Sequence, residues 1–154
     1  MQTSSEPEQH TQAQKKEEAI EQIKMQAPQV IASYRALSEQ LRPLFEVEAQ
    51  EEAYVAETIR GIYETHADIL DYLEAAKYLV NEELMEKTLI QFHESIPESL
   101  AALEGYLEAG DYENFTIKVH ALKSSARLIG ATKLSQMALE MEMRGKRLLK
   151  ADGE

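Results

Sequence analysis

Apolar residues recur along most of this chain at alternating spacings of three and four, and this pattern restricts the fold more than any other feature. Such spacing places the apolar side chains on one face of a helix. The 154 residues include only 6 Gly and 4 Pro, so the chain has few residues suited to the tight turns of β-hairpins. The pattern therefore predicts an all-α protein.

The first apolar seam runs over residues 20–44 and is interrupted by Pro28 and Pro43. Because proline removes a helical hydrogen bond, we expect a break or kink near Ala27 and a helix end at residues 45–47. The polar residues before the seam have nothing to bury, and residues 1–12 are expected to form a disordered tail.

A second seam lies between residues 55 and 80 and fits either one long helix or two stacked ones. Its members are Val55, Ile59, Ile62, His66, Ile69, Leu73, Ala76 and Val80. Asn81, followed by two glutamates, predicts the N-cap of a third helix, which Gly110 ends.

Two further helices are expected over residues 112–129 and 132–149. The apolar stripe of the first of these comprises Phe115, Val119, Leu122, Ala126 and Ile129. Because the connections are short, neighbouring helices must pack mostly antiparallel, which predicts an up-down helical bundle.

Composition excludes several classes of function. The formal net charge of −12 makes a general nucleic-acid binder or a ligand of anionic membranes improbable. The absence of Cys excludes a disulfide scaffold, a thiolate nucleophile and any zinc site built on Cys. No signal peptide or membrane-spanning run is present, so we expect a cytoplasmic protein. We also expect no metal and no cofactor.

The charge is unevenly distributed along the sequence. Residues 1–110 carry 22 acids and 8 bases, whereas residues 111–150 carry 4 acids and 8 bases. The region that contains the last two predicted helices is therefore cationic within an acidic chain.

His120 lies at the centre of this cationic region. On an ideal helix it is about 140° from the apolar stripe, with Lys123 at about 80° and Arg127 at about 120°. Thr116, at about 100°, shares this face, and Ser124 is a small residue one turn beyond His120. An accessible imidazole beside cations suits a nucleophile that attacks a phosphoryl group. A solvated helix face is the commoner explanation of the spacing alone.

The sequence FTIKVHALKSSARLIGA, residues 115–131, closely resembles the signature helix of histidine-containing phosphotransfer (HPt) domains, the intermediates of multistep two-component phosphorelays. The resemblance extends from about residue 82 to 147, about 40% of the chain. It implies that His120 is the phosphoacceptor and that Lys123 neutralises charge on the phosphoryl group. Ser124 stands where the family often has Gly; together with Thr116 and Arg127 it is a candidate for partner contact.

The resemblance also implies the partners. In this family an aspartyl phosphate on a receiver domain is donor and acceptor, and the receiver supplies Mg²⁺, so we expect a response-regulator receiver domain or a hybrid histidine kinase. The chain has no Gly-rich phosphate loop, Walker motif or ATP-binding domain, which favours a stoichiometric phosphoryl carrier over an enzyme. Two alternatives stay open: an acidic helical adaptor or scaffold without chemistry, and a family member that docks receivers without accepting phosphate.

The family's antiparallel four-helix bundle normally uses one more helix after the equivalent of residues 140–146. We expect residues 27–45 to fill that position, as in a circular permutation, either within the chain or swapped between two chains. The protein would then be a monomer or a helix-swapped dimer. Residues 13–80 are accordingly expected to hold N-terminal helices, one of which completes the bundle, and residues 81–150 to form the HPt-like core.

Overall fold

The chain folds into helices packed along one long axis. A computed structural model describes residues 11–42, 52–79 and 81–152. Within these residues there are six helices and no strand, as follows: α1 (Gln12–Leu41), α2 (Glu52–Thr65), α3 (Tyr72–Tyr78), α4 (Glu82–Ala109), α5 (Tyr112–Leu128) and α6 (Thr132–Asp152). The predicted all-α fold is confirmed.

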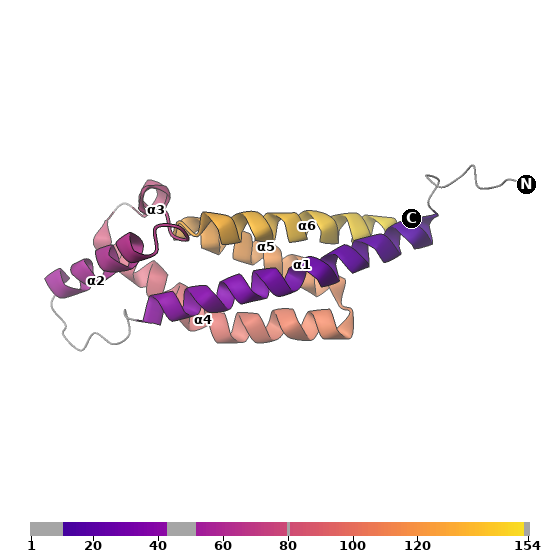
Figure 1. Cartoon of the computed structure of the whole chain (residues 1–154), viewed down its shortest axis with the longest axis horizontal. Helices are drawn as coiled ribbons and strands as arrows, with labels where there is room; N and C mark the ends of the chain where they lie inside the picture. The colour runs from indigo at the N-terminus through magenta and orange to yellow at the C-terminus, as the bar shows by residue number, and fades with distance from the viewer. Residues whose placement is uncertain (1–10, 43–51, 80, 153–154) are drawn as a thin grey trace, which may run out of the picture.

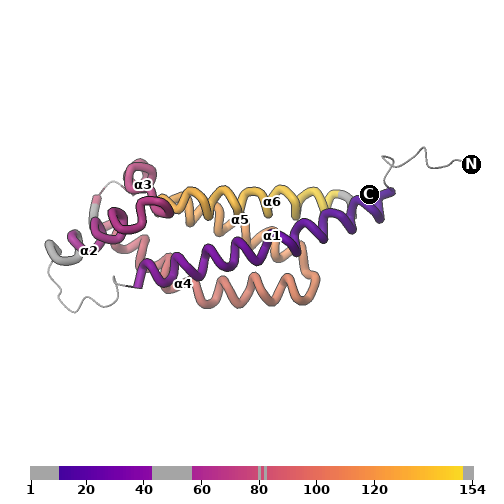
Figure 2. Tube along the Cα trace, in the orientation of Figure 1, coloured from indigo at the N-terminus to yellow at the C-terminus, as the bar shows by residue number. Residues whose placement is uncertain are grey.

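Four long helices form an antiparallel bundle. α1, α4, α5 and α6 lie lengthwise, and α2 and α3 gather at one end (Figure 1). The helices contact one another in the cyclic order α1, α4, α5, α6, and each runs opposite to its two neighbours (Figure 2). The fourth position of the bundle is therefore filled by α1 of the same chain.

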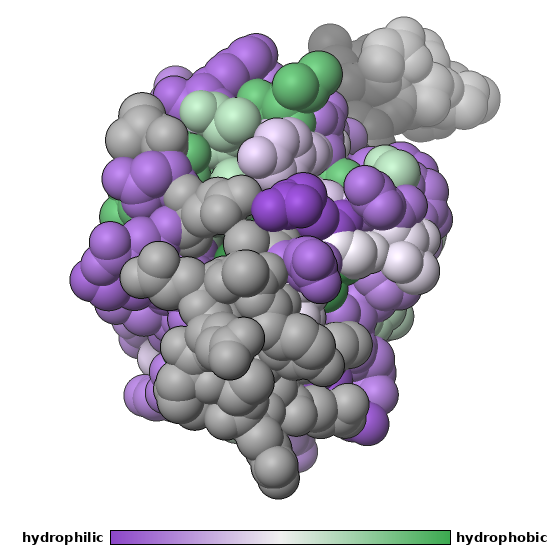
Figure 3. All heavy atoms as spheres, turned by 90° about the vertical axis from the view of Figure 1, so that its left-hand side faces the viewer, coloured by the Kyte–Doolittle hydropathy of each residue, from purple (hydrophilic) through white to green (hydrophobic). Residues whose placement is uncertain are grey.

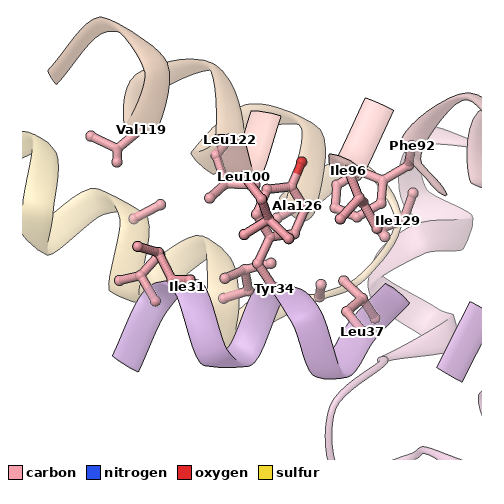
Figure 4. Close-up of a cluster of buried hydrophobic side chains, with 14 of the residues drawn as sticks. Ile31, Tyr34, Leu37, Phe92, Ile96, Leu100, Val119, Leu122, Ala126 and Ile129 are labelled. Atoms are coloured by element: carbon pink, nitrogen blue, oxygen red, sulfur yellow. The ribbon is translucent and has the colours of Figure 1, made fainter. Parts of the chain in front are cut away.

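The core fills the space between these four helices. Ile31, Tyr34 and Leu37 of α1 face apolar side chains of α4 and α5 (Figure 4). The rings of Tyr34 and Phe92 are 5.7 Å apart at a tilted angle. All five residues of the stripe predicted for α5 are buried. The period of the apolar residues thus predicted correctly which face of α5 turns inward.

Of the predicted break or kink near Ala27, the break is wrong, because α1 continues through Pro28 as one helix. Ile23 and Val30, on either side of the proline, are buried in the same core, and this packing supports one continuous helix. α1 ends at Leu41, earlier than residues 45–47. The end fits the proline that follows Arg42, since a residue before proline is disfavoured in a helix.

The second seam contains two helices rather than one. α2 ends at Thr65, and a turn over residues 66–71 precedes α3. The seam does not continue across this turn: Leu73 is 75% exposed, whereas Leu70 and Ala75 are buried. The turn changes the helical phase, so the three-and-four spacing no longer identifies the buried face.

Local capping interactions fix both ends of α4 and the start of α5. The side chain of Asn81 accepts a hydrogen bond from the backbone of Leu84 at 2.7 Å, as predicted for an N-cap. Gly110 ends α4 with a φ of 71°, a conformation that favours glycine. Asp111 then caps α5 through the backbone N–H of Asn114.

Parts of the predicted organisation lie outside the described residues. The expected tail falls mostly on residues 1–10, and the helix that follows already begins at Gln12. The division into residues 13–80 and 81–150 stays a prediction. None of the helices in the described ranges is long and apolar enough to cross a membrane.

The contribution of α1 to the bundle can be tested with one pair of substitutions. Leu37 is fully buried, so Leu37→Ala is expected to lower the free energy of unfolding by about 2–5 kcal/mol. Met25→Ala changes a residue of the same helix that is 69% exposed, and we expect less than about 0.5 kcal/mol. Denaturant unfolding followed by circular dichroism measures both, and equal effects would contradict the packing of α1 in the core.

Candidate functional site

His120 projects from the middle of α5 into solvent. Its side chain is 58% exposed, although Val119 beside it is fully buried in the core. The stripe that buries one face of α5 therefore leaves His120 on the outer face. The imidazole is held by α6, because its Nδ1 lies 2.5 Å from Oε2 of Glu142.

Glu142 is the central group of the site. Its side chain is only 2% exposed, and its two oxygens contact three nitrogen groups. Lys123 donates to Oε1 at 2.7 Å, and Lys146 lies 2.8 Å from Oε2, the oxygen that also contacts His120. One carboxylate thus links two residues of α5 to one of α6.

The ionisation of Glu142 follows from these contacts. Burial by itself raises the pKa of the carboxyl group, but hydrogen bonds with Lys123, Lys146 and His120 outweigh burial and lower its pKa to about 2. Glu142 is therefore negatively charged at neutral pH. A buried charge of this kind is stable only because each oxygen has a charged or polar partner.

This charge determines which nitrogen of His120 carries the proton. An ionised carboxylate only accepts hydrogen bonds, so Nδ1 of His120 must donate to Glu142. In the neutral imidazole, Nε2 then carries no hydrogen and keeps its lone pair. Since the side chain is largely exposed, Nε2 is free to meet a reacting group from outside.

The α5–α6 hairpin sets the register that brings these groups together. Near one end, a Cβ on Gly145 would lie 1.9 Å from Oγ1 of Thr116, so only glycine allows the two helices to approach this closely. Nearer the turn, the hydroxyl of Ser135 donates to the backbone carbonyl of Lys123 at 2.9 Å. Glu142 lies between these two contacts, opposite His120.

The turn of this hairpin is fixed by α2 and α3. Gly130 has a φ of 81°, and a Cβ added at this position would lie 2.1 Å from the backbone oxygen of Asp71. The backbone N–H of Asp71 donates to the carbonyl of Gly130 at 2.8 Å. The buried hydroxyl of Tyr63 donates to the carbonyl of Ile129 at 2.7 Å. Both carbonyls of the turn are thereby satisfied by the helices at the end of the bundle.

The predicted site residues divide into three groups. The structure brings His120 and Lys123 together through Glu142. Ser124 and Arg127 are exposed on α5 near His120, and their contact with a partner stays a prediction. Thr116 is only 5% exposed and donates its hydroxyl to a backbone carbonyl within α5. The expectation that Thr116 contacts a partner is corrected, because the close approach of α6 covers it.

The sequence did not reveal the parts that Glu142 and Lys146 play in the site. Both lie on α6, and Glu142 is 22 positions from His120. The available signal was the i,i+4 spacing of an acid and a lysine, which is a common surface pair. Within the described ranges, no group of three or more His, Asp or Glu side chains is placed to hold a metal ion.

The low pKa of Glu142 predicts a dependence of stability on pH. The pKa of its carboxyl is about 2 in the folded protein against an ordinary value of 4.5, so its stabilisation is complete above about pH 4.5 and is lost toward pH 2. Glu142→Gln lacks this titration. We therefore expect the unfolding free energies of wild type and variant to converge as the pH falls through that window, measured by denaturant unfolding. Glu108→Gln controls for the loss of a surface carboxylate. A difference in unfolding free energy between wild type and Glu142→Gln that stays constant from pH 4.5 to pH 2 would contradict the prediction.

Comparison with protein families gives a match. The family model of the Hpt domain matches residues 87–153, which include most of α4 and all of α5. No curated protein and no solved structure matches the chain. The matched range contains His120, Lys123, Glu142 and Lys146, so the group of contacts described above lies wholly inside it. The chain therefore contains an Hpt domain, a helical module of histidine phosphotransfer in phosphorelay signalling.

Proposed function

We propose that His120 accepts a phosphoryl group from the aspartyl phosphate of one receiver domain and passes it to the aspartate of another. The observation that carries this proposal is the geometry of the imidazole. Its Nδ1 is held by the ionised carboxylate of Glu142, so the neutral imidazole keeps a lone pair on Nε2, and the side chain is exposed. That arrangement suits a nucleophile that must reach the phosphorus atom of another protein.

The transfer step balances without a further reactant. Nε2 of His120 attacks the phosphorus in line, the N–P bond forms and the P–O bond to the aspartyl group breaks. The electron pair of that bond leaves with the aspartate carboxylate. Because Nδ1 keeps its proton, the phosphorylated ring gains positive charge, which the carboxylate of Glu142 stabilises. Transfer to a second receiver is the reverse of this step.

Lys123 and Lys146 are suited to neutralise the phosphoryl oxygens. Both ammonium groups lie within 3 Å of Glu142, at 2.7 Å and 2.8 Å, and hence beside the imidazole. The lysine side chain is flexible and carries three donors, so one donor can stay on Glu142 while another turns to phosphate. Glu142 thus has a positioning role for both cations as well as for the ring.

The outer face of α5 offers the surface on which a receiver would dock. Ile117 is 61% exposed, and Ala121, Ser124 and Leu128 follow it as exposed residues at helical spacing. These side chains are small or apolar, so a partner can approach the helix closely beside His120. Charged side chains at the edge of this face would then orient the partner.

Hpt domains are phosphocarriers, and they interact with receiver domains and kinases. We propose that this protein is a stoichiometric carrier that does not phosphorylate itself from ATP, with a response regulator or a hybrid histidine kinase as partner. A role in the cytoplasm stays a prediction from the sequence. The alternative, an adaptor without chemistry, would use the same surface but would not need a free Nε2 on His120.

Loss of the acceptor is the decisive test. Incubation with a phosphorylated receiver and Mg²⁺ is expected to give acid-labile phosphate on the protein, and His120→Gln should abolish it. His66→Gln, in the turn after α2, is the matched control and should label like wild type. Lys123→Ala should slow labelling by about tenfold or more, since it removes one charged donor. If no receiver labels the wild-type protein, only the binding alternatives remain.

A further inference from the structure

A pocket lies directly beside the proposed phosphoacceptor site, between α3, α5 and α6. Its volume is about 270 Å³, and it is lined by Glu74, Lys123, Arg127, Thr132, Gln136 and other residues. Lys123 belongs both to this pocket and to the group around Glu142. The volume is below the roughly 300–1,000 Å³ of small-molecule sites. A single side chain of a docked protein is therefore a better fit than a free ligand.

The charges around the pocket favour an acidic occupant. Among the residues that the structure describes, no carboxylate pairs with Arg127, which is exposed on α5. Glu74 is the acid of the lining, and its carboxylate accepts from Lys77 at 2.5 Å. The pocket therefore offers one unpaired cation, while its acid is already neutralised.

The charged side chains around the pocket also carry a net positive charge. Four cations, Lys77, Lys123, Arg127 and Lys146, lie among three carboxylates, Asp71, Glu74 and Glu142, which gives a formal charge of +1. The whole chain carries −12. The positive potential is therefore local, and it coincides with the pocket and the exposed imidazole.

The wall formed by α6 supplies hydrogen-bond donors. Thr132 is the first residue of α6, and the first turn of a helix has free backbone N–H groups and a partial positive charge. The amide of Gln136, one turn further on, can also donate. Donors on one wall and a guanidinium on the other match the two oxygens of a carboxylate.

α3 is held in place as the outer wall. The bond from Asp71 to the carbonyl of Gly130 joins the start of α3 to the α5–α6 turn. Seen from the end of the bundle that carries α2 and α3, the coloured surface is mostly hydrophilic but includes apolar side chains (Figure 3). Leu73 of α3, for example, is 75% exposed.

We propose that this pocket is a second anchoring point for the receiver and takes one of its acidic side chains, with Arg127 as the counter-ion and α3 as the outer wall. The proposal rests on the proposed function. Arg127 is seven residues, or about 10 Å, along α5 from His120. A protein interface of standard size covers about 800 Å² on each partner, which is enough to include both.

The test uses opposite changes of charge on the two walls. Phosphotransfer from a phosphorylated receiver is measured at several receiver concentrations to separate KM from kcat. Arg127→Gln is expected to raise KM about tenfold, the effect of one charge-assisted hydrogen bond, and Arg127→Lys should recover much of it. Glu74→Gln should lower KM, because it leaves the charge of Lys77 without its counter-ion and so makes the surroundings of the pocket more positive. Glu108→Gln removes an acid at the far end of α4 and should leave KM unchanged.

Two results would overturn the anchoring pocket: an unchanged KM in Arg127→Gln, or changes of the same sign in Arg127→Gln and Glu74→Gln. Labelling of His120 by phosphoramidate, a small phosphoryl donor, is measured for every variant to correct for altered reactivity of the imidazole. This labelling also separates the two proposals. If wild type is labelled neither by phosphoramidate nor by a receiver, the proposed function fails; if it is labelled and KM does not respond to Arg127, only the pocket fails.

Discussion

The site depends on one buried carboxylate. Glu142 is 2% exposed, and desolvation alone would favour its neutral form. Hydrogen bonds with His120, Lys123 and Lys146 reverse that preference, so the negative charge and its partners stabilise one another. The tautomer of His120 is a consequence of this charge, and so is the position of both lysines. Neutralising Glu142 would therefore remove the constraint on all three residues at once, although none of them belongs to the hydrophobic core.

That carboxylate meets its partners only because the α5–α6 hairpin has a fixed register. A shift of one residue along α6 would rotate Glu142 by about 100° and carry it away from His120. The register is held by the contact of Gly145 with Thr116, by the bond between Ser135 and Lys123, and by the turn at Gly130. Fold and site are thus coupled through small residues. Glycine at positions 130 and 145 matters because no side chain would fit there.

The sequence predicted α4 and α5 well because the signals for these helices are local. Asn81, Gly110 and the stripe of α5 each act within a few residues of the chain. The predictions that failed concern features that depend on packing between distant segments of the chain. Pro28 did not break α1, since the residues on both sides of it lie in one core, and Leu73 is exposed because the turn before α3 changes the helical phase. The candidate site shows the same division. His120 and Lys123 are neighbours on one helix, whereas the burial of Thr116 and the role of Glu142 depend on where α6 lies.

Charge distribution adds a constraint that neither the fold nor the motif supplies. At physiological salt, interactions between exposed charges weaken over about 8 Å, so a docking partner responds mainly to the nearest groups. The positive local charge around the pocket and His120 would therefore attract an acidic surface, while the rest of a chain of −12 would repel it at longer range. Attraction confined to one face favours a single orientation over non-specific adhesion. Because α3 forms one edge of that face and lies outside the matched range of residues 87–153, the proposed anchoring pocket would let the segment before the Hpt domain tune which partner is accepted without changing the proposed phosphoacceptor.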